Sequence, residues 1–221
     1  MPIEWNQNFI NEWTAFIQAY AAQFDGNPNI YSIQMAGWGY IGEMALPDAQ
    51  TSTITEWNDA GYTDQNYETG MKSVLSAYVN AFHITPLNVD ITEPLGSSSH
   101  VLDGSSGMLS YIWDTYPHKV YMQQNGLQAN YYTSPSTEPY YKDITNAAAY
   151  TTSGFQMYGG QGNLNTQTGD RLEAFEAAVC AGVSYVEVYD SDIAQSSLQS
   201  DLDFLATKNA NGAVSFSCPS D

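Results

Sequence analysis

Three carboxylates stand at or beside the ends of apolar stretches in this sequence. Glu43 closes the stretch 33–44, IQMAGWGYIGEM, in which an apolar run leads into glycines and aromatics. Glu187 stands between two valines in SYVEVYD, and Asp90 ends the run PLNVD. Carboxyl groups held near a reacting bond transfer protons as general acids and bases. These three positions are therefore the first candidates for chemistry.

Each carboxylate also has a purely structural interpretation. A single glutamate in a glycine-rich loop is usually only solvated, which applies to Glu43. Burying Glu187 between valines would be costly unless it were paired or hydrogen-bonded, so a structural ion pair with Arg171 or Lys119 is the alternative to chemistry. Asp90 could cap the segment that follows it. The residues alone leave these alternatives open.

The remaining reactive residue types form no recognisable site. His83, His100 and His118 are scattered along the chain, and no GxSxG, P-loop or GxGxxG motif is present. Cys180 and Cys218 lack the spacing of a zinc or redox site. They form either one disulfide that ties the C-terminal tail to a helix or two unrelated thiols. We predict no metal and no cofactor.

The charge balance limits the partners of the chain. The 221 residues include 24 Asp and Glu against five Lys and Arg, a net charge of -19. A surface of this sign repels phosphate backbones and anionic lipids, so nucleic-acid binding is not expected. Only 13% of the residues are charged, while tyrosines number 17. An uncharged hydrogen-bonding surface suits a neutral polyhydroxylated ligand such as a sugar, and it is also common in extracellular structural proteins.

The sequence predicts a globular chain without membrane insertion. Apolar residues make up 43% of it, and no run of 18 apolar residues occurs. The first residues, MPIEWNQNF, show neither the basic stretch nor the apolar core of a secretory signal. Such a signal could have been removed or could lie outside this chain.

Helical and strand patterns alternate along the chain. Apolar residues at three- and four-residue steps predict a helix over 5–24, and the next apolar run, 30–36, is rich in strand formers. The same alternation recurs four times, with helices over 66–83, 106–117, 140–153 and 168–183 and strands over 86–91, 119–124, 154–160 and 184–190, before a last helix over 196–209. A repeat of about 35 residues predicts parallel βαβ units.

The predicted strands have one apolar and one polar face. The two-residue period turns one set of side chains away from the helices: Gln34, Asn88, Asp90, Tyr121, Gln123, Gln156, Tyr158, Tyr185, Glu187 and Tyr189. A doubly wound sheet buries both faces and would read as continuous apolar runs. We therefore expect an α/β fold of the TIM type, a (β/α) barrel forming a single domain over 1–221. Five strands cannot close such a barrel, so three βα units are missing, supplied by a partner chain, or hidden from the pattern.

Two segments carry a resemblance to a known group of enzymes. The segment FIQAYAAQFDGNPNIYSIQMAGWGYIGE resembles the third helix and fourth strand of retaining glycoside hydrolases with (β/α)8 barrels, in particular the β-galactosidase-related families, where a Gly-Glu pair closes this strand. AFEAAVCAGVSYVEVYDSDI resembles their last helix and eighth strand. The resemblance implies that this chain covers strands four to eight. Many relatives carry Asn directly before the strand-four acid, where Gly42 stands here.

The resemblance also implies roles for particular residues. Glu43 takes the position of the acid that protonates the glycosidic oxygen. The strand-seven position of the nucleophile holds Gln156, an amide that cannot attack the sugar. The chain is then an inactivated variant, a naturally non-hydrolytic relative, or an enzyme whose second carboxylate lies elsewhere. Glu187 is the best substitute and Asp90 the next. A Glu43–Glu187 pair across a barrel would suit the ~6.5–9.5 Å of inverting enzymes better than the ~5–5.5 Å of retaining ones.

The expected function is the hydrolysis of a neutral glycan outside the cell, with Glu43 as general acid. Partial burial among Trp38, Tyr40 and Ile41 would raise the pKa of Glu43, as that role requires. Aromatic, amide and carboxylate side chains near the same rim are expected to contact the sugar: Trp38, Tyr40, Asp90, Gln123, Gln156, Tyr158 and Tyr189. The alternative is a carbohydrate-binding or surface structural protein that holds sugar on the same scaffold without cleaving it.

Overall fold

The protein is described by a computed structural model, which covers residues 2–40, 42–46, 51–102, 107–159, 168–211 and 218. It divides into two compact units, Met1–Tyr121 and Met122–Asp221, and each is described by itself. Helices and parallel strands alternate along the chain, which confirms the predicted α/β class. The TIM-type closure and the single domain stay predictions.

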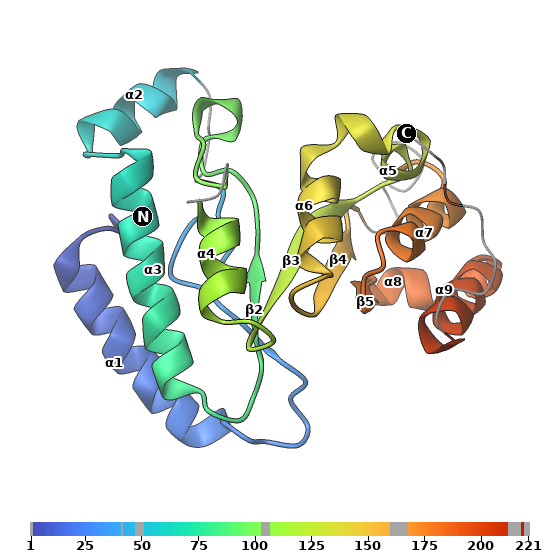
Figure 1. Ribbon diagram of the computed structural model, residues 1–221, viewed down its shortest axis with the longest axis horizontal. Coiled ribbons are helices and arrows are strands. Elements are labelled where there is room, and N and C mark those ends of the chain that lie inside the picture. Colours follow the sequence, from blue (N-terminus) through green and yellow to red (C-terminus); the bar gives the residue numbers. More distant parts are fainter. Residues whose placement is uncertain are drawn as a thin grey trace. The chain divides into compact units, whose positions relative to one another are not determined.

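The helices and strands lie close to the predicted ranges (Figure 1). The strands are β1 (Ile33–Gln34), β2 (Leu87–Asp90), β3 (Val120–Leu127), β4 (Ser153–Met157) and β5 (Tyr185–Glu187). The α-helices are α1 (Gln7–Phe24), α2 (Thr51–Asp59), α3 (Asp64–Ala81), α4 (Met108–Thr115), α5 (Asn130–Thr133), α6 (Pro139–Ala147), α7 (Arg171–Cys180), α8 (Asp190–Ile193) and α9 (Gln199–Asn211). Short 3-10 turns lie at Gly96–Ser98, Pro135–Thr137 and Ser196–Leu198.

Three of these helices were not predicted. Helices α5 and α8 have four residues each, fewer than the number needed to show a 3.6-residue period. Helix α2, TSTITEWND, is mostly polar and gives no clear apolar stripe. No helix in the described part of the chain combines the length and the apolarity that crossing a membrane requires.

The strands pair in parallel, β1 with β2 in the first unit, and β4 with both β3 and β5 in the second. Ile33 pairs with Leu87 in the first unit. In the second unit, Gly154 of β4 pairs with Gln123 on one side and with Tyr185 on the other. Between Gln124 and Leu127 the register of β3 shifts against β4. Parallel pairing places the carboxyl ends of neighbouring strands at the same edge of the sheet.

In the first unit, α1 and α3 run side by side (Figure 1). Helix α1 begins at Asn6, whose side chain accepts a hydrogen bond from the Asn8 backbone N–H at 2.9 Å. The core contains Ile17, Tyr67, Leu75 and Phe82, all at most 1% exposed. The capping residue fixes the start of α1, and the apolar side of the helix packs against α3.

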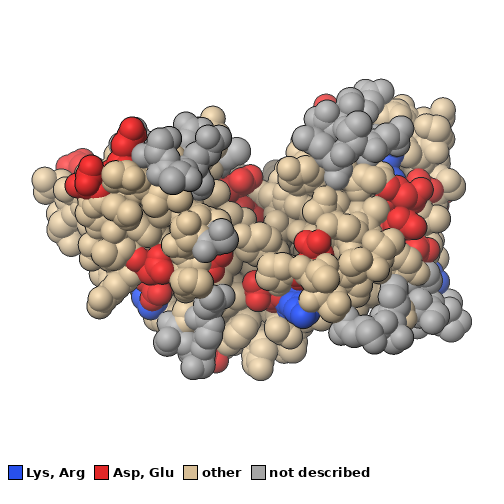
Figure 2. All heavy atoms as spheres, turned by 90° about the horizontal axis from the view of Figure 1, so that it is seen from above, with Lys and Arg blue, Asp and Glu red and all other residues tan. Residues whose placement is uncertain are grey.

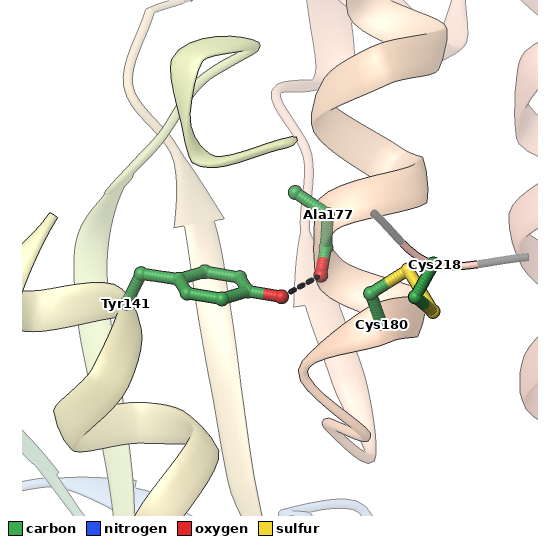
Figure 3. Close-up of a disulfide and its surroundings, with 4 residues drawn as sticks. All are labelled: Tyr141, Ala177, Cys180 and Cys218. Carbon is green, nitrogen blue, oxygen red and sulfur yellow. Dashed lines mark hydrogen bonds between the residues drawn. A yellow bond between two sulfur atoms is a disulfide. The ribbon is translucent and has the colours of Figure 1, made fainter. Parts of the chain in front are cut away.

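In the second unit, the apolar side of β4 packs against the surrounding helices. Phe155 is fully buried and its ring stacks on Tyr141 of α6, with centroids 6.2 Å apart. The Tyr141 hydroxyl donates a hydrogen bond to the Ala177 carbonyl of α7 at 3.3 Å (Figure 3). Cys180 at the end of the same helix forms a disulfide with Cys218, with Cα atoms 5.6 Å apart (Figure 3). The structure therefore selects the disulfide from the two alternatives left by the sequence.

Burial follows the predicted two-residue period in β1 and at Gln156 of β4, but all four residues of β2 are buried, including Asn88 and Asp90, which were predicted to lie on the polar face. Ile33 is 6% exposed, whereas Gln34 beside it is exposed. Gln156 is half-buried between the buried Phe155 and Met157. Strand β5 is less covered, and Val186, predicted to face helices, is only half-buried. This difference arises because β5 is the last strand of the sheet and has a neighbour on one side only.

Candidate functional site

The predicted site residues fall into two groups, one in each compact unit. The first unit contains Trp38, Tyr40, Glu43 and Asp90, and the second contains Gln123, Gln156, Tyr158, Glu187 and Tyr189. The two groups are described separately.

A hydrogen-bond network joins the polar faces of β3 and β5. The Gln123 amide nitrogen donates to Asn125 Oδ1 at 2.8 Å and to Glu187 Oε2 at 3.1 Å. The Tyr185 hydroxyl donates to the side-chain amide oxygen of Gln123, Oε1, at 2.9 Å. Both ends of the amide are thus occupied, which fixes its orientation. Gln123 is only 3% exposed, so the amide that donates to the carboxylate of Glu187 is itself buried.

The network passes over Gly154 of β4. Gly154 pairs with Gln123 and with Tyr185, so these three residues lie side by side on adjacent strands. A Cβ atom at Gly154 would overlap the Tyr185 ring and would lie 2.6 Å from its Cε1. Because glycine has no side chain, the tyrosine ring lies across β4 and its hydroxyl reaches β3. Gly154 is therefore a packing requirement of the network.

Glu187 is exposed, and its carboxylate accepts a hydrogen bond from the side-chain amide of Gln123. The burial cost inferred from its valine neighbours does not arise, because strand β5 is at the edge of the sheet. Among the described residues it forms no ion pair with Arg171 or Lys119. The structural ion pair that was the alternative to a chemical role for Glu187 is therefore not found among the described residues. A solvent-facing carboxylate with a fixed hydrogen-bond donor is available to a ligand.

Two exposed tyrosines follow the neighbouring strands. Tyr158 comes directly after β4 and is 48% exposed, and Tyr189 comes shortly after β5 and is 37% exposed. The half-buried Gln156 pairs in register with Glu187. Aromatic rings beside amide and carboxylate groups offer both a stacking surface and hydrogen-bonding partners. The carboxyl ends of β3, β4 and β5 thus bring together five predicted residues: Gln123, Gln156, Tyr158, Glu187 and Tyr189.

In the first unit, Glu43 lies on a tightly held turn after β1. Its backbone N–H donates to the Tyr40 carbonyl at 3.0 Å, and the Tyr40 N–H donates to the Ala45 carbonyl at 2.7 Å. Gly39, with φ +59°, leaves no space for a side chain, because its Cβ would overlap the Glu43 carbonyl. Tyr67 of α3 donates from its hydroxyl to the Met44 carbonyl at 2.6 Å. The backbone of this turn is fixed, while the Glu43 side chain is half-buried.

The other predicted residues of the first unit differ in exposure. Tyr40 is 58% exposed and presents its ring to solvent. Trp38 is 1% exposed, so its ring packs inside the unit and offers no open face for stacking. Asp90 is fully buried at the end of β2. Ile41, expected to contribute to the burial of Glu43, lies outside the described residues.

Surface charge is unevenly mixed with uncharged groups. On the face drawn in Figure 2 uncharged residues cover most of the surface, and the acidic residues form separate groups. Within the described part of the chain, no group of three or more His, Cys, Asp and Glu is arranged to hold a metal ion. The chemistry of the candidate site thus depends on carboxylate, amide and phenol groups.

Sequence reasoning missed the residues that organise the network. Tyr185 was assigned to the polar face but not to the site, although it is two positions before Glu187 and therefore on the same side of the strand. Gly154 gave no signal, since its role depends on the register of three strands. Asn125 lies beyond the predicted end of its strand, which continues to Leu127.

Comparison with known proteins found no matching family model, no similar curated protein and no similar solved structure.

Proposed function

We propose that this protein binds a neutral glycan at the carboxyl ends of β3, β4 and β5. The observation that carries the proposal is the Tyr185–Gln123–Glu187 network, in which a buried amide holds an exposed carboxylate. Sugar hydroxyls bind to such fixed acceptors and donors without supplying a charge of their own. The net charge of -19 further disfavours anionic ligands.

The exposed tyrosines support a sugar rather than another neutral ligand. Tyr158 and Tyr189 follow two adjacent parallel strands, and both rings are open to solvent. An apolar ring face beside hydrogen-bonding groups suits a pyranose, which has apolar C–H faces and a polar rim. The disulfide between Cys180 and Cys218 is consistent with an oxidising compartment, so we place the protein outside the cell.

Binding can be tested by calorimetry against a panel of neutral oligosaccharides. We expect Tyr158→Ala and Tyr189→Ala each to weaken binding about tenfold, a loss of about 1.4 kcal/mol. Tyr150→Ala is the matched control, because Tyr150 is equally exposed at 48% but lies after α6. Equal losses from Tyr150 and Tyr158 would mean that the tyrosines do not form a specific site.

Glycoside hydrolysis is the second candidate, and the held turn around Glu43 favours it. A general acid must keep a defined position relative to the bond that it protonates. The turn provides this through the hydrogen bonds of Tyr40 and Tyr67. In this proposal Glu43 donates the proton to the glycosidic oxygen.

Turnover of aryl glycosides separates the hydrolase from the binding protein. If the chain is a hydrolase, Glu43→Gln lowers turnover at least ~100-fold, the usual scale of general acid–base help. Glu56→Gln, an exposed position on α2, is the control with the same charge change. Gln156→Glu places a carboxylate on β4 at the position that the resemblance assigns to the nucleophile. Gain of hydrolysis supports the enzyme, and unchanged binding without turnover supports the non-catalytic protein.

A further inference from the structure

Glu4 is a buried carboxylate that the candidate site does not include. It lies in a turn before α1, closed by a hydrogen bond from the Asn6 N–H to the Ile3 carbonyl at 3.0 Å. The turn lies directly on α3, where a Cβ at Gly70 would be 3.1 Å from the Glu4 carbonyl oxygen. Glu4 is only 5% exposed. The position of its side chain is therefore set by the packing of the turn on the helix.

The Glu4 carboxylate is directed at the loop that carries Glu43. It accepts a hydrogen bond from the Gly39 backbone N–H. Its second oxygen, Oε2, is buried and has no hydrogen-bond partner within the described part of the chain. Burial raises the pKa of Glu4 to about 7, and the hydrogen bond from Gly39 lowers it only in part. A buried carboxylate with one bonded oxygen is costly to keep ionised.

Gly39 links Glu4 to Glu43 through the backbone. The Gly39 Cα lies so close to the Glu43 carbonyl that no side chain fits between them. The other side of the turn is held by the Tyr67 hydroxyl at Met44. Glu4 and Tyr67 thus hold the two sides of the turn, at Gly39 and at Met44, and Glu43 lies between these two residues in the chain.

We propose that Glu4 is a positioning residue, whose carboxylate fixes the Gly39–Met44 turn and thereby the location of Glu43. The effect on turnover rests on the hydrolytic role proposed for Glu43, whereas the anchoring of the turn does not. When Glu4 gains or loses its proton, the group that accepts the hydrogen bond from the Gly39 N–H changes between a neutral carboxyl and a carboxylate. The hydrogen bond that holds the turn therefore differs between the two sides of neutral pH.

The titratable groups near Glu4 come from α3 and the segment before it. Tyr67 faces Glu4 and is fully buried, and burial followed by the charge of Glu4 raises the pKa of this phenol. Tyr62 lies beyond Tyr67 and donates to Asp64 at 2.7 Å. The pKa values of both phenols are raised, so they stay neutral near pH 7. Compared with these two phenols, Glu4 has the pKa near 7.

The test follows the Gly39 amide by NMR in the full-length chain, without any sugar. In the wild type the Gly39 amide shift should titrate with a midpoint near pH 7. Glu4→Gln keeps the shape and an acceptor oxygen but cannot ionise, so this titration should vanish. Glu12→Gln, an exposed position on α1, removes the same charge and should retain it. Glu4→Ala should speed hydrogen exchange of the Gly39 amide at least ~10-fold through loss of the bond.

The outcomes separate the anchoring from the function. A wild-type Gly39 amide that does not titrate, or that titrates equally in Glu4→Gln, overturns the proposal. Loss of the titration in Glu4→Gln alone supports it, even if no variant cleaves any glycoside, and in that case the hydrolytic function fails instead. If the wild type is active, Glu4→Gln should alter the pH profile of kcat while Glu12→Gln should not. An unaltered profile would remove Glu4 from the mechanism.

Discussion

Replacing Gly154 by alanine is the most direct perturbation of the β3–β5 network. The new Cβ would overlap the Tyr185 ring, so the ring must move and its hydroxyl must leave Gln123. Overpacking costs ~1–3 kcal/mol, and the lost hydrogen bond costs about 1 kcal/mol. Alanine is favoured over glycine within a strand by ~0.5–1 kcal/mol, which offsets part of this cost. We expect Gly154→Ala to lower the free energy of unfolding by about 2 kcal/mol.

A double-mutant cycle with Tyr185→Ala isolates the contact. The three atoms nearest to the new Cβ all belong to the Tyr185 ring, so removing the ring removes this overlap and leaves the strand preference of alanine. Gly154→Ala should then stabilise the Tyr185→Ala protein by ~0.5 kcal/mol or more, which reverses the sign of its effect. The free energies come from urea unfolding of the four proteins. The Gly154→Ala protein should also bind glycan at least ~10-fold more weakly than the wild type, because Gln123 no longer orients Glu187.

Ser153→Ala is the control for this cycle. It changes the neighbouring position of β4 and removes a buried hydroxyl for which the described residues provide no hydrogen-bond partner. Its effect on stability should therefore be close to zero or favourable. If Gly154→Ala destabilises the wild type and the Tyr185→Ala protein equally, the Tyr185 ring does not lie across Gly154, and the account of the network is refuted.

Three further predictions concern stability. Replacing Cys180 and Cys218 by alanine should lower the free energy of unfolding by up to about 4 kcal/mol, because the bridge closes a loop of 38 residues; equal urea midpoints would contradict this. A pKa of Glu4 raised from 4.5 to about 7 means that the protonated form stabilises the fold, so about 3 kcal/mol should be lost as the pH rises from about 4.5 through 7. This loss should be absent from Glu4→Gln in unfolding curves. Burial raises the pKa of Asp25, but the N–H groups of residues 83–85 outweigh it and lower the pKa to about 2, so Asp25 should stabilise the fold above pH 4 and cease to do so as the pH falls through 2. Asp25→Asn should remove this acid-sensitive step, and an unchanged acid unfolding curve would count against it.

The sequence predicted the five strands and the longer helices, but not α2, α5 and α8, and not that all four residues of β2 are buried. The aromatic and aliphatic steps of α1 and the alternation in β4 are local consequences of a 3.6- and a 2-residue period. Such periods fix which side chains point the same way whatever the neighbours are. The polar face that includes Gln123, Gln156 and Glu187 could therefore be read from the letters alone. The position of Glu187 on this face was likewise predicted from the sequence.

The sequence alone could not reveal the network, because its members come from three strands. Tyr185 is 62 positions from Gln123, and their contact depends on the register of β4 between them. A register one residue different would turn Tyr185 to the opposite face. Gly154 has no chemistry of its own, so only the ring above it shows why a side chain is excluded.

Local pattern determined which residues form helices and strands and which way their side chains face, since both follow from backbone geometry over a few residues. The tertiary structure alone decided that Glu4 is buried against Gly39, that Trp38 is enclosed and that Glu187 stays in solvent. Burial is a property of everything that packs around a side chain. Its neighbours are brought there by the long-range pairing of strands and helices, which the order of residues in any one segment does not encode.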